Sequence, residues 1–194
     1  MTNKLLFFVL LALCFSGCDM LETHPYDVHI TGERELTNKN IQLIENKMQS
    51  KKTIRFAMIS DTQRWYNSTE DVVKALNARG DIDFVIHGGD QSDFGVTKEF
   101  IWMRDIFNKF QMPYVCLLGN HDCLGTGEDA YRAIYGDPNF AFTAGNVRFI
   151  CLNTNAMEYD YSEPVPDFNF IENELNNLSP EIEKTVFAMH VKPF

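Results

Sequence analysis

Short apolar runs recur along this chain, and each one ends at a residue type that binds metal ions. The runs are residues 56–60 before Asp61, 84–89 before Asp90, 114–119 before Asn120, His121 and Asp122, and 185–189 before His190. Continuous apolar runs this short favour buried parallel strands over core helices. The pattern therefore predicts strands that are buried in the core of the fold.

The segments between these runs have the periodicity of helices. We expect helices at 38–48, 69–79, 97–110, 127–135 and 167–178, and strands at 28–30, 54–60, 83–87, 114–118, 140–143, 147–153 and 185–190. Thr37 and Thr69 are the expected helix caps, and Gly80 is expected to end the second helix. The order strand–helix–strand–helix–strand predicts an α/β sandwich with right-handed crossovers.

Parallel strands bring the residues that follow them to one edge of a sheet. Three carboxylates, one amide and two imidazoles are expected there, from Asp61, Asp90, Asp122, Asn120, His121 and His190. Such donors suit hard or borderline divalent metals and the hydrolysis of a charged ester. His87 lies inside a strand, and we expect it to be a structural histidine rather than a ligand.

Composition and charge narrow the class of protein. The 194 residues allow one domain with a sizeable core. A net charge of −10 argues against non-specific nucleic-acid binding, which depends on Lys and Arg. Cys116 and Cys151 lie in strand-like runs and are expected to be buried. Cys123 follows the Asn-His-Asp cluster, and packing is the expected role for it over metal binding.

The first residues have the pattern of a secretory signal. Lys4 precedes an apolar stretch at 5–15, which is too short to span a bilayer. Ser16-Gly17-Cys18 then resembles a bacterial lipobox, after which Cys18 would carry lipid. We therefore expect a signal peptide at 1–17, a tether at 18–51, and an extracytoplasmic protein of the bacterial cell envelope that is anchored in the lipid bilayer. An ordinary signal peptide with an incidental cysteine is the alternative.

Four motifs from Ile54 to His190 carry a resemblance to a known family. They are Ser60-Asp61-Thr62-Gln63, Gly88-Gly89-Asp90, Gly119-Asn120-His121-Asp122 and Met189-His190. In this order they resemble the successive blocks of the calcineurin-like metallophosphoesterases. The resemblance implies an α/β sandwich of two mixed β-sheets flanked by helices, over a domain at 52–194. It also implies metal-dependent hydrolysis of a phosphorylated small-molecule substrate.

The family has two divalent metal ions, and here they would be Mn, Fe, Zn or Mg. By resemblance, Asp90 bridges the two ions, since an ionised carboxylate has two oxygens to offer. Asp61 would bind the first ion, and Asn120 and His190 would bind the second. His121 would face the substrate, where it stabilises the phosphoryl group or protonates the leaving alkoxide. Asp122 would orient the His121 ring and favour its charged form.

The chain departs from the family pattern at two places. Gln63 occupies a position that is usually histidine, where its carbonyl would be a weaker metal ligand. Asp93, three residues after Asp90, is a possible substitute, although a solvated loop aspartate is the more ordinary role.

The closing Gly-His-any-His block is not found, and the sequence given ends four residues after His190. The expected domain is therefore C-terminally incomplete. An inactive truncated remnant and a lipid-anchored metal- or ligand-binding module stay open beside the enzyme. Trp65 and Tyr66 would either form a substrate wall or simply pack.

Overall fold

Two three-stranded sheets pack against each other in the computed structural model, which describes residues 24–49, 51–155 and 165–192. The predicted signal peptide and Cys18 lie outside these residues. None of the helices in the described ranges is long and apolar enough to cross a membrane. The boundary predicted between tether and domain stays a prediction.

The first sheet contains β1 (Phe56–Ile59), β2 (Phe84–His87) and β3 (Tyr114–Cys116) in that order, and all are parallel. Ile59 pairs with His87, and His87 pairs with Cys116, so the three strands end at one edge. The resemblance implied two mixed sheets. The two-sheet α/β sandwich is confirmed, and the described strands of this sheet all run the same way because helices connect them.

The second sheet contains β4 (Phe140–Ala144), β5 (Val147–Leu152) and β6 (Lys184–Met189). β4 and β5 form the predicted hairpin, whereas β6 pairs with β5 in parallel, so this sheet is mixed as expected. Leu152 pairs with Met189, the last residue of β6. His190 therefore follows directly from a strand end, as the sequence predicts.

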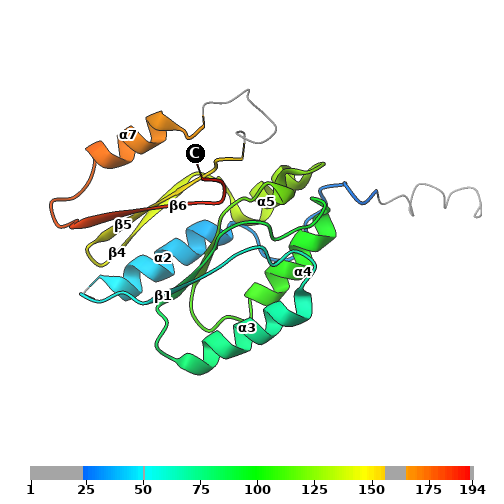
Figure 1. Ribbon diagram of the computed structural model, residues 1–194, viewed down its shortest axis with the longest axis horizontal. Helices are drawn as coiled ribbons and strands as arrows, with labels where there is room; N and C mark the ends of the chain where they lie inside the picture. Colours follow the sequence, from blue (N-terminus) through cyan, green and yellow to red (C-terminus); the bar gives the residue numbers. More distant parts are fainter. Residues whose placement is uncertain (1–23, 50, 156–164, 193–194) are drawn as a thin grey trace, which may run out of the picture.

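Five helices and one 3₁₀ turn are described. They are α2 (Leu36–Met48), α3 (Tyr66–Arg79), α4 (Thr97–Phe107), η1 (His121–Cys123), α5 (Gly127–Tyr135) and α7 (Phe168–Asn176). Figure 1 shows α3 and α4 below the first sheet and α7 above the second. The ion pair between Arg148 on β5 and Glu174 on α7, at 2.6 Å, joins α7 to its sheet.

Three expectations about local structure are wrong. Thr69 does not cap α3, which begins at Tyr66; its hydroxyl donates to the Trp65 carbonyl at 2.7 Å from within the helix. Thr37 lies inside α2 rather than before it. Residues 28–30 form no strand, and Thr97 Oγ1 instead donates to the Asp27 carbonyl just before them.

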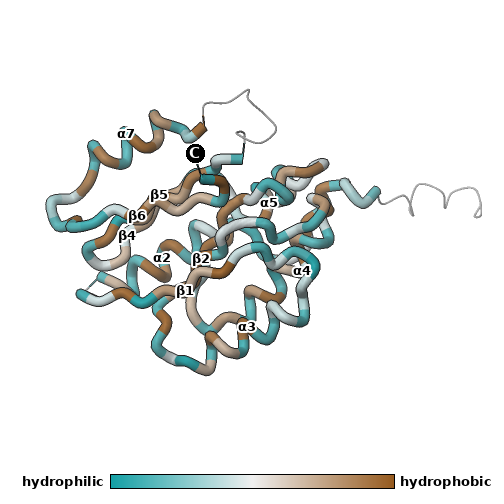
Figure 2. Tube along the Cα trace, in the orientation of Figure 1, coloured by the Kyte–Doolittle hydropathy of each residue, from teal (hydrophilic) through white to brown (hydrophobic). Residues whose placement is uncertain are grey.

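Two apolar clusters hold the layers together. One lies between the sheets, where Phe142 and Phe149 stack at 4.9 Å and Phe84 meets Phe142 edge-on. The other joins the first sheet to α3, α4 and α5 through buried residues such as Phe100 and Phe107. In Figure 2, apolar and polar segments alternate along α2 and α7. This pattern gives α2 a buried face that includes Ile44 and Met48, whereas α7 has no fully buried residue.

Candidate metal centre

Three side chains from three strand ends converge at one edge of the sandwich. Asp61 follows β1, Asp90 lies just beyond β2, and His190 follows β6. Each offers one ligand atom, and these atoms lie within 4.8 Å of one another. Two carboxylates and an imidazole at this spacing match the ligands of a divalent metal. The structure therefore brings together three of the five predicted ligands as one group.

The backbone around these carboxylates is in a conformation that non-glycine residues rarely adopt. Asp61 and Asp90 have φ of 56° and 60°, and Gln63 has φ of 27°. The Asp61 N–H donates to the Gly89 carbonyl at 3.1 Å, and the Gln63 N–H donates to the Asp90 carbonyl at 3.0 Å. The two loops thus hold each other in this strained conformation, which is typical of a binding site.

Glycines allow the loops to approach so closely. A Cβ on Gly119 would lie 2.1 Å from the Asp90 nitrogen, and a Cβ on Gly89 would lie 2.7 Å from His190 Nδ1. Both distances are shorter than the contacts that a Cβ atom makes in proteins, and Gly89 also has φ of +105°. The glycines of the second and third motifs are therefore required where Asp90 meets its neighbours.

His190 is held so that one ring nitrogen faces the other ligands. Its Nδ1 lies 2.8 Å from the Gly88 carbonyl, which can only accept, so this nitrogen carries the hydrogen. Its Nε2 lies 2.9 Å from Asn120 Oδ1 and 3.5 Å from Asp90 Oδ1. In a neutral ring, the Nε2 lone pair would face two oxygen lone pairs, which repel it. A cation among these three atoms removes that repulsion, so the residues fit the implied metal.

Gln63 reaches the centre through its amide nitrogen. Nε2 donates to Asp90 Oδ2 at 3.2 Å, so the amide is hydrogen-bonded to the carboxylate that is expected to bridge the ions. Asp93 lies outside the three-residue group, and its carboxylate meets Arg64 at 3.2 Å. The ligand role of Gln63 stays a prediction, and the suggested substitution by Asp93 is not what the geometry favours.

Asp122 does not have the contact that the sequence predicted. Instead of pairing with His121, its fully buried carboxylate accepts backbone N–H groups from Asp90, Gln91, Ser92 and Gly119 at 2.8 to 2.9 Å. Burial raises the pKa of Asp122 to about 7, and the N–H groups of Ser92 and Gly119 oppose that shift. Asp122 thus ties together the two loops that carry Asp90 and Asn120.

Asp93 takes the place beside His121 that was expected for Asp122. His121 Nδ1 lies 2.9 Å from the Asp93 carbonyl oxygen, and the Asp93 carboxylate lies 3.8 Å away. Hydrogen bonding to that carbonyl raises the pKa of His121, and the charge of Asp90 adds to the effect. The side chain of His121 remains 39% exposed.

His87 has the structural role that was predicted for it. It is buried beneath the Gly88–Gly89 loop, where Nδ1 accepts the Gly89 N–H at 3.2 Å and Nε2 meets Thr62 Oγ1 at 2.9 Å. Burial lowers the pKa of His87 to about 3, and the nearby His190 acts in the same direction. Cys116 and Cys151 are buried as predicted, and Cys123 packs against the core while its thiol donates to the Gly119 carbonyl.

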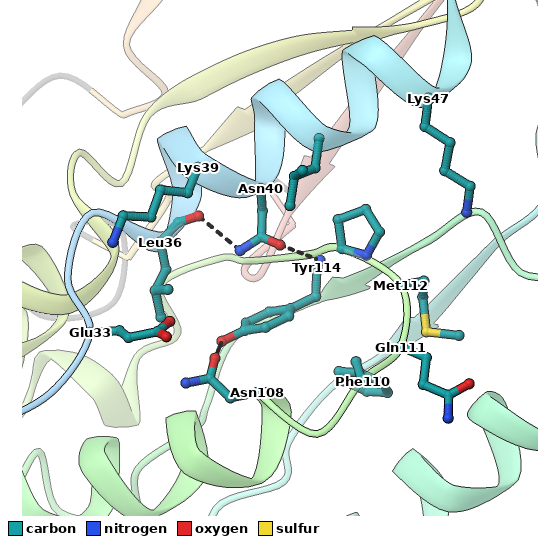
Figure 3. A pocket seen from close by; sticks show the side chains of 12 residues that line it. Glu33, Leu36, Lys39, Asn40, Lys47, Asn108, Phe110, Gln111, Met112 and Tyr114 are labelled. Atoms are coloured by element: carbon teal, nitrogen blue, oxygen red, sulfur yellow. Dashed lines mark hydrogen bonds between the residues drawn. The ribbon is translucent and has the colours of Figure 1, made fainter.

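A separate cavity of about 590 Å³ lies at the other end of β3, between α2 and the segment that leads into the strand. Figure 3 shows Asn40 bonded to Leu36 and Tyr114 there, while the Tyr114 hydroxyl meets Asn108. Its lining includes none of the predicted site residues. The cavity is therefore distinct from the candidate metal centre, which lies at the carboxyl ends of the strands.

The comparisons with known proteins agree with this geometry. Residues 54–194 match the family model described as calcineurin-like phosphoesterase. Over 124 residues, the chain is 27% identical to a 3′,5′-cyclic-nucleotide phosphodiesterase of Nostoc sp. (strain PCC 7120). The match covers 63% of this chain and 46% of that protein, so this chain spans about half the length of the curated relative.

A solved structure supports the fold. The purple acid phosphatase isolated from yellow lupin (Lupinus luteus) seeds is similar with a TM-score of 0.54 and 16% sequence identity. The similarity covers 72% of this chain and 30% of the phosphatase. At this identity, the likeness concerns the α/β architecture with two sheets.

Proposed function

We propose, because this chain belongs to the calcineurin-like phosphoesterase family, that it hydrolyses phosphate esters at a metal centre. One observation carries the proposal: ligand atoms of Asp61, Asp90 and His190 lie within 4.8 Å of one another, inside the segment that matches the family. Asn120 supplies a further oxygen beside His190. These four residues would hold the metal, and Gln63 would support Asp90 from the opposite side.

The chemistry needs both charge neutralisation and an activated water molecule. Bound divalent ions supply both, because they offset the charge of the ester and lower the pKa of water. Asp61 and Asp90 provide the negative charge that retains such ions. Asp122 contributes indirectly, because its hydrogen bonds to Asp90 and Gly119 fix the distance between the two ligand-bearing loops.

His121 is proposed to act on the phosphoryl group. Its Nδ1–H donates to the Asp93 carbonyl, and this contact raises its pKa and favours the charged ring. The Nε2–H would then donate to a phosphoryl oxygen or give its proton to the departing alkoxide. The role resembles the one predicted from sequence, but the residue that positions the ring is Asp93.

Hydrolysis of 4-nitrophenyl phosphate with added Mn²⁺ tests the proposal. We expect turnover by the wild-type protein and its loss in Asp90→Asn. Asp129→Asn, which changes an exposed aspartate at the start of α5, serves as the matched control and should retain activity. Absence of turnover in a folded wild-type protein supplied with Mn²⁺ would contradict the proposal and favour an inactive remnant.

We also propose that the mature protein is lipid-anchored through Cys18 on the outer side of a bacterial membrane. The support is the sequence alone: an apolar stretch at 5–15 followed by Ser16-Gly17-Cys18. Metabolic labelling with a radioactive fatty acid should mark the wild-type protein and not Cys18→Ser. Equal labelling of the two proteins would contradict the anchor.

A further inference from the structure

An exposed guanidinium lies beside the histidine that is proposed to contact the phosphoryl group. Arg64 Nη2 donates to Asp93 Oδ1 at 3.2 Å, and the same oxygen lies 3.8 Å from His121 Nδ1. Arg64 Nη2 and His121 Nδ1 therefore both lie close to one carboxylate oxygen of Asp93. The Arg64 side chain is 65% exposed, whereas that of Asp93 is only 7% exposed.

This guanidinium has capacity for a second anion. It carries five N–H donors in a planar fork, and the Asp93 contact uses the Nη2 group. Its surroundings are acidic, because Asp61, Asp90 and Asp93 all lie at or beside the centre. A phosphoryl dianion that enters such a site is repelled by these carboxylates, so a cation at the rim favours its binding.

An exposed aromatic residue directly follows each member of this ion pair in the sequence. Trp65 follows Arg64 and is 61% exposed, and Phe94 follows Asp93 and is 58% exposed. Because Arg64 and Asp93 are hydrogen-bonded, the two segments that carry these rings are held next to each other. Large apolar side chains in solvent next to a polar centre are suited to contact a flat organic group.

We infer that Arg64, Trp65 and Phe94 form the substrate-binding rim of the centre and select phosphate esters whose organic part carries a ring. Arg64 pairs with a non-bridging oxygen of the phosphoryl group, and Trp65 and Phe94 contact the ring. The inference rests on the proposed function, and it assigns specificity to three residues outside the ligand set.

Binding of inorganic phosphate to the Mn²⁺-loaded protein, measured by calorimetry, tests the guanidinium without requiring turnover. We expect Arg64→Gln to weaken phosphate binding about tenfold, which corresponds to about 1.4 kcal/mol. Arg64→Lys keeps the charge, so its affinity for phosphate should lie between those of Arg64→Gln and wild type. Arg79→Gln is the matched control, because Arg79 is an exposed arginine paired with Asp81 at 2.9 Å at the other end of α3.

The aromatic residues are tested with a pair of substrates. In the double variant Trp65→Ala/Phe94→Ala, we expect KM for 4-nitrophenyl phosphate to rise about tenfold, while KM for methyl phosphate and the affinity for inorganic phosphate stay the same. Phe168→Ala removes a ring that is also 61% exposed, but on α7, and should change none of these values.

The outcomes separate this inference from the proposed function. Equal phosphate affinity in wild type and Arg64→Gln overturns the role of Arg64. If the substitution shifts only the pH profile of turnover, Arg64 acts only through Asp93, which also overturns the anion contact. Equal KM changes for both substrates overturn the role of the aromatic rings. Arg64-dependent phosphate binding without any turnover would instead contradict the hydrolase and support the anion contact.

Discussion

Asp122 accepts a hydrogen bond from the backbone N–H of Asp90 at 2.9 Å, and the same carboxylate accepts the N–H of Gly119. Through this one side chain, the loop after β2 is fixed to the loop after β3. Asp122 lies next to His121 in the sequence, yet it acts on the shape of the centre rather than on the imidazole. A buried carboxyl group that accepts several N–H groups at once is difficult to replace.

Asp122→Asn should therefore lower the stability of the fold. The amide keeps one oxygen but turns its NH₂ group toward N–H donors, so buried donors lose their acceptor. We expect the free energy of unfolding to fall by about 3 kcal/mol in urea titrations. Asp137→Asn is the control, since the exposed Asp137 accepts a single N–H from Asn139, and its effect should stay below about 1 kcal/mol. Equal losses of stability in the two variants would contradict the conclusion that Asp122 connects the two loops.

Two glycines with different surroundings test the close approach of the loops. Gly119→Ala places a Cβ 2.1 Å from the Asp90 nitrogen, and we expect a loss of at least about 3 kcal/mol. A Cβ at Gly80 meets no atom within 4 Å, so only the φ of +69° disfavours Gly80→Ala. We expect this substitution to lower the free energy of unfolding by about 1–2 kcal/mol. Thermal unfolding of both variants measures the difference. A milder effect at Gly119 than at Gly80 would contradict the packing described here.

The order of the strands along the chain and the residues that follow them could be predicted because they depend on short stretches of sequence. The prediction of buried strands is confirmed for β2 and β3 but wrong for β1 and β6, which are partly exposed. Asp61 and Asp90 meet because the parallel strands of the first sheet end at one edge, whereas His190 reaches them from β6 of the second sheet. The boundaries of α5 were predicted correctly, since Gly127 and Gly136 border an amphipathic segment. These features depend on residues that are near one another in sequence.

The partners of Asp122 and the start of α3 were not predictable in this way. Three of the N–H groups that Asp122 accepts, from Asp90, Gln91 and Ser92, lie 30 to 32 positions earlier in the chain, so only the folded arrangement of the loops reveals them. Thr69 had the residue type of a cap, but helix α3 begins three residues earlier, where Trp65 has no capping side chain. Likewise, nothing in the sequence spacing indicates that Arg64 pairs with Asp93.

The buried His87 predicts a pH dependence of stability. Its pKa is lowered to about 3 in the fold by burial, whereas an unfolded histidine titrates near 6.5. The unfolded chain therefore binds the proton more readily, and stability falls as the pH drops below about 6.5. Between pH 7 and pH 5, wild type should lose about 2 kcal/mol more than His87→Gln in urea titrations. Parallel curves for the two proteins would show that His87 is not the titrating group.

His121 should affect catalysis and leave the fold intact. Its side chain is 39% exposed, so His121→Gln is expected to change the melting temperature little. The loss of a proton donor should lower kcat for 4-nitrophenyl phosphate by about 10²–10³. His29→Gln alters an exposed histidine of the N-terminal segment and should leave kcat unchanged. A normal kcat in His121→Gln would remove the imidazole from the mechanism.

Calorimetric titration of Mn²⁺ into the metal-free protein tests the centre most directly. Asp90 is the buried carboxylate that reaches both His190 and Gln63, so Asp90→Asn should weaken Mn²⁺ binding at least about tenfold relative to wild type. Asp129→Asn should bind as wild type does. Indistinguishable isotherms for folded wild-type and Asp90→Asn proteins would contradict a metal centre at Asp61, Asp90 and His190.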